Sequence, residues 1–103
     1  MQQLSTPTYK TNHQSFSDSH IACTDHAIVR MKQRGIKPAW INLLLEYGCY
    51  AYQNSQKTYS IYLNKSSIKR IKMHFGNLVD LSKLRRVYLI MTSDSVLVTC
   101  AYR

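Results

Sequence analysis

Residues 26–36 have the sequence HAIVRMKQRGI, and the interpretation of the whole chain starts from this run. It places His26, Arg30 and Arg34 four residues apart, so a helix would carry all three along one side. Imidazole can move a proton near neutral pH, and guanidinium can grip a phosphate with its planar fork. Cleavage of an RNA backbone needs both chemistries. The same spacing of His and Arg also occurs on ordinary helices whose polar side is simply solvated.

The residues around this run predict where the helix begins and ends. Thr24 is a suitable N-cap, and Asp25 suits the first turn of the helix that it would cap. Gly35 supplies the left-handed residue that commonly ends a helix. We therefore expect a helix over 25–33 whose buried side is formed by Ala27, Ile28 and Met31.

A second helix is predicted directly after the first. Pro38 suits its first turn, and Gly48 is expected to stop it. Its apolar side recurs with a helical period through Trp40, Ile41, Leu44 and Leu45. Because the connection is short, we expect the two helices to form a helical hairpin.

The pattern then changes from helical to strand-like. Segments 49–53 and 58–63 are rich in Tyr and β-branched residues, as are 87–91 and 96–102. Helical periodicity returns over 64–74 and briefly over 78–84. The chain is therefore predicted to be an α+β protein, with an N-terminal helical hairpin packed on a four-stranded antiparallel sheet. A basic helical insertion separates the second and third strands.

Composition limits the setting in which the protein works. The 103 residues and 45% hydrophobic content fit one domain, which we place at 20–103 after a flexible polar arm at 1–19. No apolar stretch approaches the ~20 residues that span a bilayer, and no signal peptide is recognisable, so we expect a cytoplasmic protein without membrane contact. Cys23, Cys49 and Cys100 are widely spaced and are expected to be reduced thiols, two of them buried.

The charge of the chain indicates a polyanionic partner. Fourteen Lys and Arg residues face five Asp and Glu residues, giving a net charge of +9. Such an excess suits nucleic acid or an anionic surface, whereas the alternative is a solvated helix surface that aids solubility. Eight tyrosines could add base stacking, although Tyr is also a good strand residue. The nucleic-acid-binding residues are predicted to be Lys65, Lys69, Arg70, Lys72, Arg85 and Arg86.

The run at 26–36, together with the strand VTCAYR at 98–103, resembles a small toxin-like domain family. That family carries a His-x-x-x-Arg-Met-x-x-Arg-Gly-Ile helix signature and is grouped with ribonucleases of the barnase–EndoU–colicin–RelE type. The resemblance implies a metal-independent RNA-cleaving site, without a cofactor, where helix and sheet meet. The insertion at 64–86 is longer than the resemblance leads us to expect. The catalytic residues that the resemblance implies are His26, Arg30, Arg34, Thr99 and Tyr102.

A metal-free mechanism would let the ribose 2′-hydroxyl lose its proton to a base and attack the adjacent phosphate, while the bond to the 5′-oxygen breaks and an acid protonates that leaving oxygen. His26 is the best candidate for the base or the acid, and Arg30 and Arg34 would stabilise the phosphorane charge. Thr99 or Tyr102 would orient the nucleotide. His74 is a distant candidate for a second proton-transfer group.

A metal site is the other chemistry that the sequence raises. His20, Cys23 and His26 are spaced by three residues, and His13 lies upstream. The predicted helix start at Thr24 separates these groups, and no paired cysteine motif accompanies them. We therefore expect no metal.

Three functions fit these observations. The first is an endoribonuclease that cleaves single-stranded RNA, as the toxin of a toxin–antitoxin pair with an acidic antitoxin-like partner. The second is a non-catalytic nucleic-acid-binding module of the same fold. The third is an interaction protein for an acidic partner, without a nucleic-acid role.

Overall fold

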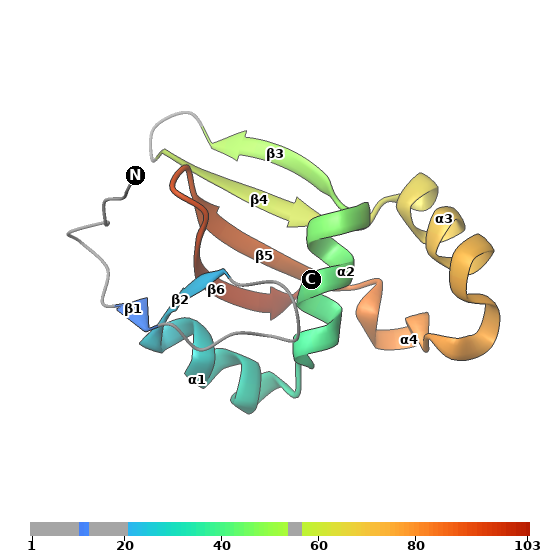
Figure 1. The fold of residues 1–103 in the computed structure, drawn as a ribbon, viewed down its shortest axis with the longest axis horizontal. Coiled ribbons are helices and arrows are strands. Elements are labelled where there is room, and N and C mark those ends of the chain that lie inside the picture. The colour runs from blue at the N-terminus through green and yellow to red at the C-terminus, as the bar shows by residue number, and fades with distance from the viewer. Residues whose placement is uncertain (1–10, 13–20, 54–56) are drawn as a thin grey trace.

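The computed structural model describes residues 11–12, 21–53 and 57–103. It is an α+β structure built on one sheet, in which the strands follow the order β1-β2-β6-β5-β4-β3 (Figure 1). The strand bounds are β1 Thr11–Asn12, β2 Ala22–Thr24, β3 Cys49–Gln53, β4 Thr58–Tyr62, β5 Val87–Thr92 and β6 Val96–Tyr102.

The four strands predicted from the sequence are present, but the predicted four-stranded antiparallel sheet does not match in detail. β3, β4, β5 and β6 pair antiparallel, as expected. The sheet continues beyond β6 through β2, which pairs parallel with it, and through β1, which pairs antiparallel with β2. The sheet is therefore mixed. β2 was missed because three residues directly before a helix are too short to show alternation, and because its partner strand lies far along the chain.

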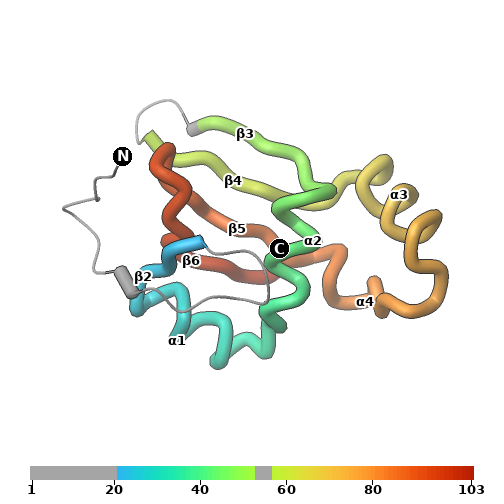
Figure 2. Tube along the Cα trace, in the orientation of Figure 1, coloured from blue at the N-terminus to red at the C-terminus, as the bar shows by residue number. Residues whose placement is uncertain are grey.

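The two helices expected as an N-terminal hairpin are α1 Asp25–Arg34 and α2 Pro38–Tyr47. They do not form a mutually packed pair at the start of the fold. β2 precedes α1, α1 packs on β6 and β2, and α2 packs against β4, β5 and α3. Ile36, in the connection between the two helices, is itself buried in the core. This anchor directs each helix to a different part of the sheet (Figure 2).

The two faces of the sheet differ in burial. The strand register aligns Ile61, Leu89 and Cys100, which are fully buried in the core shared with α1 and α2. The next aligned row consists of Tyr62, Tyr88 and Ala101, which are half-buried. Because successive strand residues point to opposite faces, this row lies on the face turned away from α1 and α2, which we call the outer face.

The basic insertion between β4 and β5 was predicted correctly in its position. It contains α3 Lys65–Phe75, the 3-10 helix η1 Gly76–Leu78 and α4 Leu81–Leu84. The side chain of Asn64 caps α3 by accepting a hydrogen bond from the Ser67 amide at 2.8 Å. The insertion projects beyond one end of the sheet, well away from α1 (Figures 1 and 2).

Several smaller predictions concern segments described only in part. The polar arm at 1–19 lies outside the described residues except for Thr11–Asn12, which form β1. Between β3 and β4, residues 54–56 lie outside the described part of the chain, and Lys57 has a φ of 52°. All three cysteines are free thiols, and Cys23 and Cys100 are buried. Within the described chain, no helix has the length and apolar character needed to cross a membrane.

Candidate nucleic-acid interface

The helix that carries the opening run has the caps that the sequence predicted. The Thr24 hydroxyl accepts a hydrogen bond from the Ala27 amide at 3.0 Å. At the other end, Gly35 has a φ of 65° and donates its amide proton to carbonyls of the last turn. Since a left-handed residue ends the helix here, α1 stops at Arg34, one residue beyond the predicted end.

The three predicted groups on α1 differ in how far they reach solvent. Ala27 and Met31 are the buried residues of this helix. His26 and Arg34 are exposed, whereas Arg30 is half-buried. Arg30 belongs to the helix that packs on β6, and its charge lowers the pKa of the Cys100 thiol there, against the larger effect of burial, which raises it. α1 therefore presents one partly enclosed guanidinium beside the sheet, with an accessible imidazole one turn before it.

The two buried thiols under α1 are part of the core. Burial and the nearby Cys100 raise the pKa of Cys23 to about 12. Burial raises the pKa of Cys100 to about 11. Both thiols therefore stay protonated at neutral pH, and a protonated buried thiol is a poor nucleophile.

The two predicted site residues of β6 lie on opposite faces of the sheet. Tyr102 pairs with Val87 and packs against the core on the face that α1 covers. Thr99 pairs with Ile90 and belongs to the outer face, after an irregularity that displaces Val98 from the regular pairing. The structure thus places Tyr102 on the same side of the sheet as α1 and separates Thr99 from that helix.

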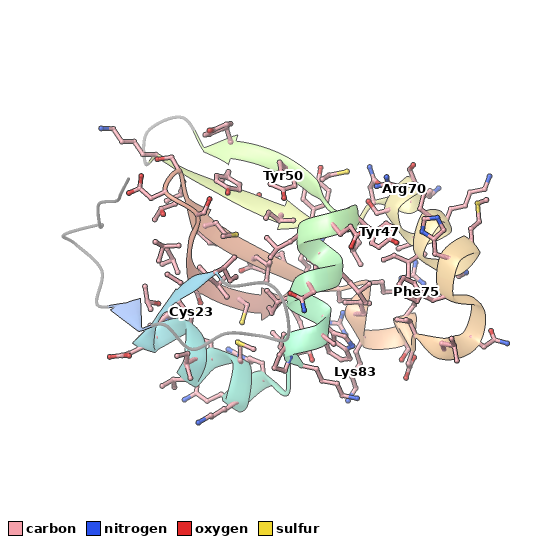
Figure 3. All side chains as sticks on the ribbon, in the orientation of Figure 1. Cys23, Tyr47, Tyr50, Arg70, Phe75 and Lys83 are labelled. Carbon is pink, nitrogen blue, oxygen red and sulfur yellow. The ribbon has the colours of Figure 1, made fainter. Side chains whose placement is uncertain are left out.

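His74, the candidate for a second proton-transfer group, is engaged elsewhere. Its Nδ1 is 2.7 Å from the Tyr47 hydroxyl, and the Tyr47 ring also meets Phe75 edge-on. Arg70 completes this contact: its Nη2 donates to the Tyr47 carbonyl at 2.9 Å, and its guanidinium lies 5.5 Å from the ring centroid. Figure 3 shows Tyr47, Arg70 and Phe75 gathered between α2 and α3. His74 and Arg70 therefore hold α3 on α2, in a region remote from α1.

The remaining lysines of α3 point away from this contact. Ser67 and Ile71 are the buried residues of the helix. Lys65, Lys69 and Lys72 follow a spacing of four and three residues, are exposed, and lie on the opposite side of the helix. We call these three residues the α3 lysine face.

Arg85 and Arg86 are exposed between α4 and β5. Arg86 donates through Nε to the carbonyl of Arg103 at 3.1 Å, and the amide of Arg103 donates to the carbonyl of Arg86 at 2.7 Å. The backbone hydrogen bond extends the pairing of β5 and β6 by one residue, and the Arg86 side chain adds a second tie to the same residue. They fix Arg103 beside the last row of the outer face.

A hollow of about 250 Å³ lies on the outer face and was missed by the sequence analysis. The Arg103 guanidinium lies 5.1 Å from the ring centroid of Tyr62 within it. The alternation of β4 and β5 puts Tyr62 and Tyr88 on one face, but only the register makes them neighbours. We call this the Tyr62–Tyr88 hollow; it is lined by Ser60, Tyr62, Tyr88, Ile90 and Arg103.

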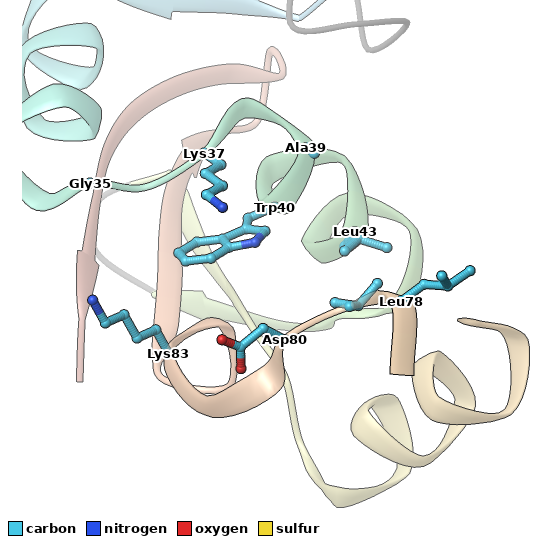
Figure 4. A pocket seen from close by; sticks show the side chains of 9 residues that line it. Gly35, Lys37, Ala39, Trp40, Leu43, Leu78, Asp80 and Lys83 are labelled. Atoms are coloured by element: carbon cyan, nitrogen blue, oxygen red, sulfur yellow. The ribbon is translucent and has the colours of Figure 1, made fainter. Parts of the chain in front are cut away.

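A second hollow, of about 430 Å³, separates α2 from the segment that leads into α4 (Figure 4). The Lys37 ammonium lies 5.6 Å from the Trp40 ring centroid on one wall. Asp80 and Lys83 lie on the other wall. Hydrogen bonds from the Ser82 amide and hydroxyl lower the pKa of Asp80, and the two lysines lower it further. This hollow therefore contains its own negative charge, and none of the predicted catalytic residues lines it.

Metal ligands do not gather in the part of the chain that is described: no group of three or more His, Cys, Asp or Glu side chains could hold an ion there. His13 and His20, which were candidate metal ligands in the sequence, lie outside the described residues.

Comparisons with protein-family models, curated proteins and solved structures found no match to this chain.

Proposed function

We propose that this protein binds single-stranded RNA, with the α3 lysine face as its main contact to the phosphate backbone. Lys65, Lys69 and Lys72 are exposed together, while Ser67 and Ile71 take up the packing side of the helix. Ammonium groups along one helix face can neutralise successive phosphates and release their counterions. This shared face is the observation that carries the proposal.

The acids that would balance such a surface are missing from α3. The helix has the sequence KSSIKRIKMHF, without Asp or Glu. A solubilising helix surface often pairs Lys with Glu or Asp three or four residues away. Asp80, the single acid between residues 65 and 86, accepts hydrogen bonds from the Ser82 amide at 3.0 Å and its hydroxyl at 2.8 Å. The positive charge of α3 thus supports an external anionic ligand.

Fluorescence anisotropy with a labelled single-stranded RNA tests this proposal. Replacing the three residues of the α3 lysine face by Ala should weaken binding and make the log–log salt slope shallower by about 0.7 for each lost phosphate contact. The matched control removes the same charge from scattered sites, as Lys32→Ala, Lys57→Ala and Lys83→Ala. An equal loss of affinity in both triple variants, or binding that does not depend on salt, would contradict the proposal.

RNA cleavage at α1 is the second candidate function, and the environment of Arg30 favours it. Arg30 is half-buried beside β6, and His26 is exposed one turn earlier. A partly enclosed guanidinium can hold a phosphate more firmly than a fully solvated one, and an accessible imidazole can move the proton of a 2′-hydroxyl. In this proposal, His26 is the base or acid, Arg30 and Arg34 hold the phosphate, and Tyr102 orients the nucleotide.

Incubation of a fluorescent single-stranded RNA with excess chelator tests the cleavage. We expect cleavage by the wild-type protein that is lost in both His26→Ala and Arg30→Ala, with binding largely retained in His26→Ala. Lys32→Ala, from the exposed side of the same helix, is the matched control and should cleave normally. RNA that is bound but stays intact would reject the catalytic role and leave the binding role standing.

The acidic antitoxin-like partner stays a prediction of the resemblance. The hollow between α2 and α4 supports a partner that carries carboxylates, because Lys37 and Lys83 outnumber the single carboxylate of Asp80 in its lining. Such a partner should compete with RNA if it also covers the α3 lysine face. Copurification of a small acidic protein that lowers RNA affinity would support this function, and an RNA affinity unchanged by that protein would count against it.

A further inference from the structure

We propose that the Tyr62–Tyr88 hollow on the outer face binds one unpaired nucleobase of an RNA strand, with Arg103 and Arg86 contacting its phosphate. The inference rests on the proposed RNA binding and adds the site that would read an individual nucleotide. Base stacking on tyrosine was expected in general terms from the sequence, and the strand register singles out Tyr62 and Tyr88 among the eight tyrosines. The hollow has the size for one base, two aromatic side chains in its lining and the guanidinium of Arg103.

The size of the hollow suits a single planar ring system. Its volume is about 250 Å³, below the roughly 300–1,000 Å³ of pockets that enclose whole drug-sized ligands. It opens on a sheet face, so a flat group can enter while the attached ribose stays outside. Ser60 lines the hollow, and its hydroxyl, which donates to the Ala51 carbonyl at 3.4 Å, can still accept a hydrogen bond from a base edge.

Two aromatic side chains form its walls. Tyr62 and Tyr88 are direct partners in the register of β4 and β5, and both are half-buried. The pairing keeps the two side chains adjacent, so part of each ring is held by the sheet and part stays accessible. Bases stack on such rings with little dependence on sequence, because every base has a π-face. A duplex hides those faces, so this contact favours unpaired RNA.

Arg103 gives the hollow its charge, and the neighbouring Arg86 adds a second guanidinium outside the lining. Arg103 lies over the Tyr62 ring, and its backbone is fixed by the hydrogen bonds that it exchanges with Arg86. A guanidinium stacked on a ring can still donate from its edge to a phosphate in bidentate geometry. Aromatic walls beside a stacked arginine suit a nucleotide, because the base can stack while the guanidinium contacts the phosphate.

The hollow and the α3 lysine face are also close in sequence. β4 ends at Tyr62, and α3 begins at Lys65. An RNA strand that leaves the hollow over this end of the sheet therefore reaches α3 within a short distance. The base site and the phosphate contacts can then act on one continuous strand.

Binding assays with two forms of one RNA test the proposal: a single-stranded oligoribonucleotide, and the same oligomer with abasic positions. Tyr88→Leu should weaken binding of the base-bearing form about tenfold and leave the abasic form unchanged, because only the base stacks. Tyr52→Leu makes the same chemical change at a tyrosine that is 73% exposed on β3, and it should leave both affinities unchanged. Arg103→Gln should weaken both forms.

The outcomes separate this inference from the function on which it rests. If the lysine-face variant loses affinity while Tyr88→Leu behaves like Tyr52→Leu, the hollow is not the base site and RNA binding still stands. If the wild-type protein binds neither oligomer, both proposals fail. A photo-crosslink of 4-thiouridine RNA to the wild-type protein needs no variant to fold. It should attach to Tyr62 or Tyr88, and crosslinks found only elsewhere would overturn the inference.

Discussion

The hydroxyl of Thr24 donates a hydrogen bond to the backbone carbonyl of Val98 at 2.9 Å. The same hydroxyl accepts the hydrogen bond from the Ala27 amide that caps α1. Val98 lies at the irregularity in β6, where it is displaced from the regular pairing with β5. One side chain therefore caps the first helix and satisfies the last strand, and it fixes α1 relative to β6.

Replacing Thr24 should destabilise the fold in a way that depends on the hydroxyl. Thr24→Ala removes a helix cap and leaves the Val98 carbonyl without this donor, so we expect a loss of about 2 kcal/mol in the free energy of unfolding. Thr24→Ser keeps the hydroxyl and should lose much less. Urea denaturation measures both, and equal losses would show that the methyl group matters rather than the hydrogen bonds.

Gly48 and Gly35 should respond differently to Ala because they are glycines for different reasons. A Cβ on Gly48 would collide with the carbonyl oxygen of Leu44 and would lie 2.6 Å from Cγ2 of Ile61. A Cβ on Gly35 would meet nothing within 4 Å, but its φ of +65° disfavours a side chain. We expect a loss of about 1 kcal/mol for Gly35→Ala and of about 3 kcal/mol for Gly48→Ala. Thermal or urea unfolding of the two variants gives the comparison, and the reverse order would mean that α2 can shift to admit the methyl group.

The hydrogen bond between Tyr47 and His74 should stabilise the docking of α3. Tyr47→Phe removes the hydroxyl but keeps the ring against Phe75, so the expected loss is about 1 kcal/mol. In a His74→Ala background the same change should cost almost nothing, because the partner is already gone. A double-mutant cycle by urea denaturation measures this coupling, and additive losses would show that the two groups act independently.

The stability of the protein should fall as pH rises above about 9. The folded-state pKa values of Cys23 and Cys100, about 12 and about 11, exceed the ordinary thiol value of 9.0. The unfolded chain therefore releases these two protons first, which favours unfolding until the pH reaches the folded-state pKa values. Below pH 9 both states keep their protons, and this contribution to stability is fully present.

Urea unfolding at pH 8 and at pH 10 checks this dependence. The Cys23→Ala/Cys100→Ala variant should lose less free energy of unfolding between the two pH values than the wild-type protein does. The comparison cancels the titration of Lys and Tyr residues that both proteins share. Identical losses in the two proteins would contradict the prediction.

The sequence was most informative where a local pattern determines local structure. The caps at Thr24 and Gly35 predicted α1 to within one residue, because a capping hydroxyl and a left-handed glycine act over a single turn. The position of the basic insertion was also predictable from the change in periodicity. Local patterns did not predict β2, because its three residues form a strand only by pairing with β6, which is distant along the chain.

The candidate surfaces show the same division. The helical spacing of Lys65, Lys69 and Lys72 was visible in the sequence. Arg70 was predicted to bind nucleic acid together with them, and only the structure shows that its guanidinium is bound to the Tyr47 carbonyl. Alternation over 99–102 puts Thr99 and Tyr102 on opposite faces, because three positions separate them. Which of the two lies under α1 depends on how β6 pairs with β5 and β2 and on which face α1 covers. Side-chain direction in a strand depends on such long-range pairing.

By itself, the sequence determined the helices, the excess of positive charge and the α+β class, because periodicity, caps and composition are local properties of the chain. Only the tertiary structure decided which charged groups share a surface. It placed Arg30 beside β6, turned three lysines of α3 outward, and joined Tyr62, Tyr88 and Arg103 in one hollow. These juxtapositions depend on strand register and helix docking, which arise from contacts between residues that are distant along the chain.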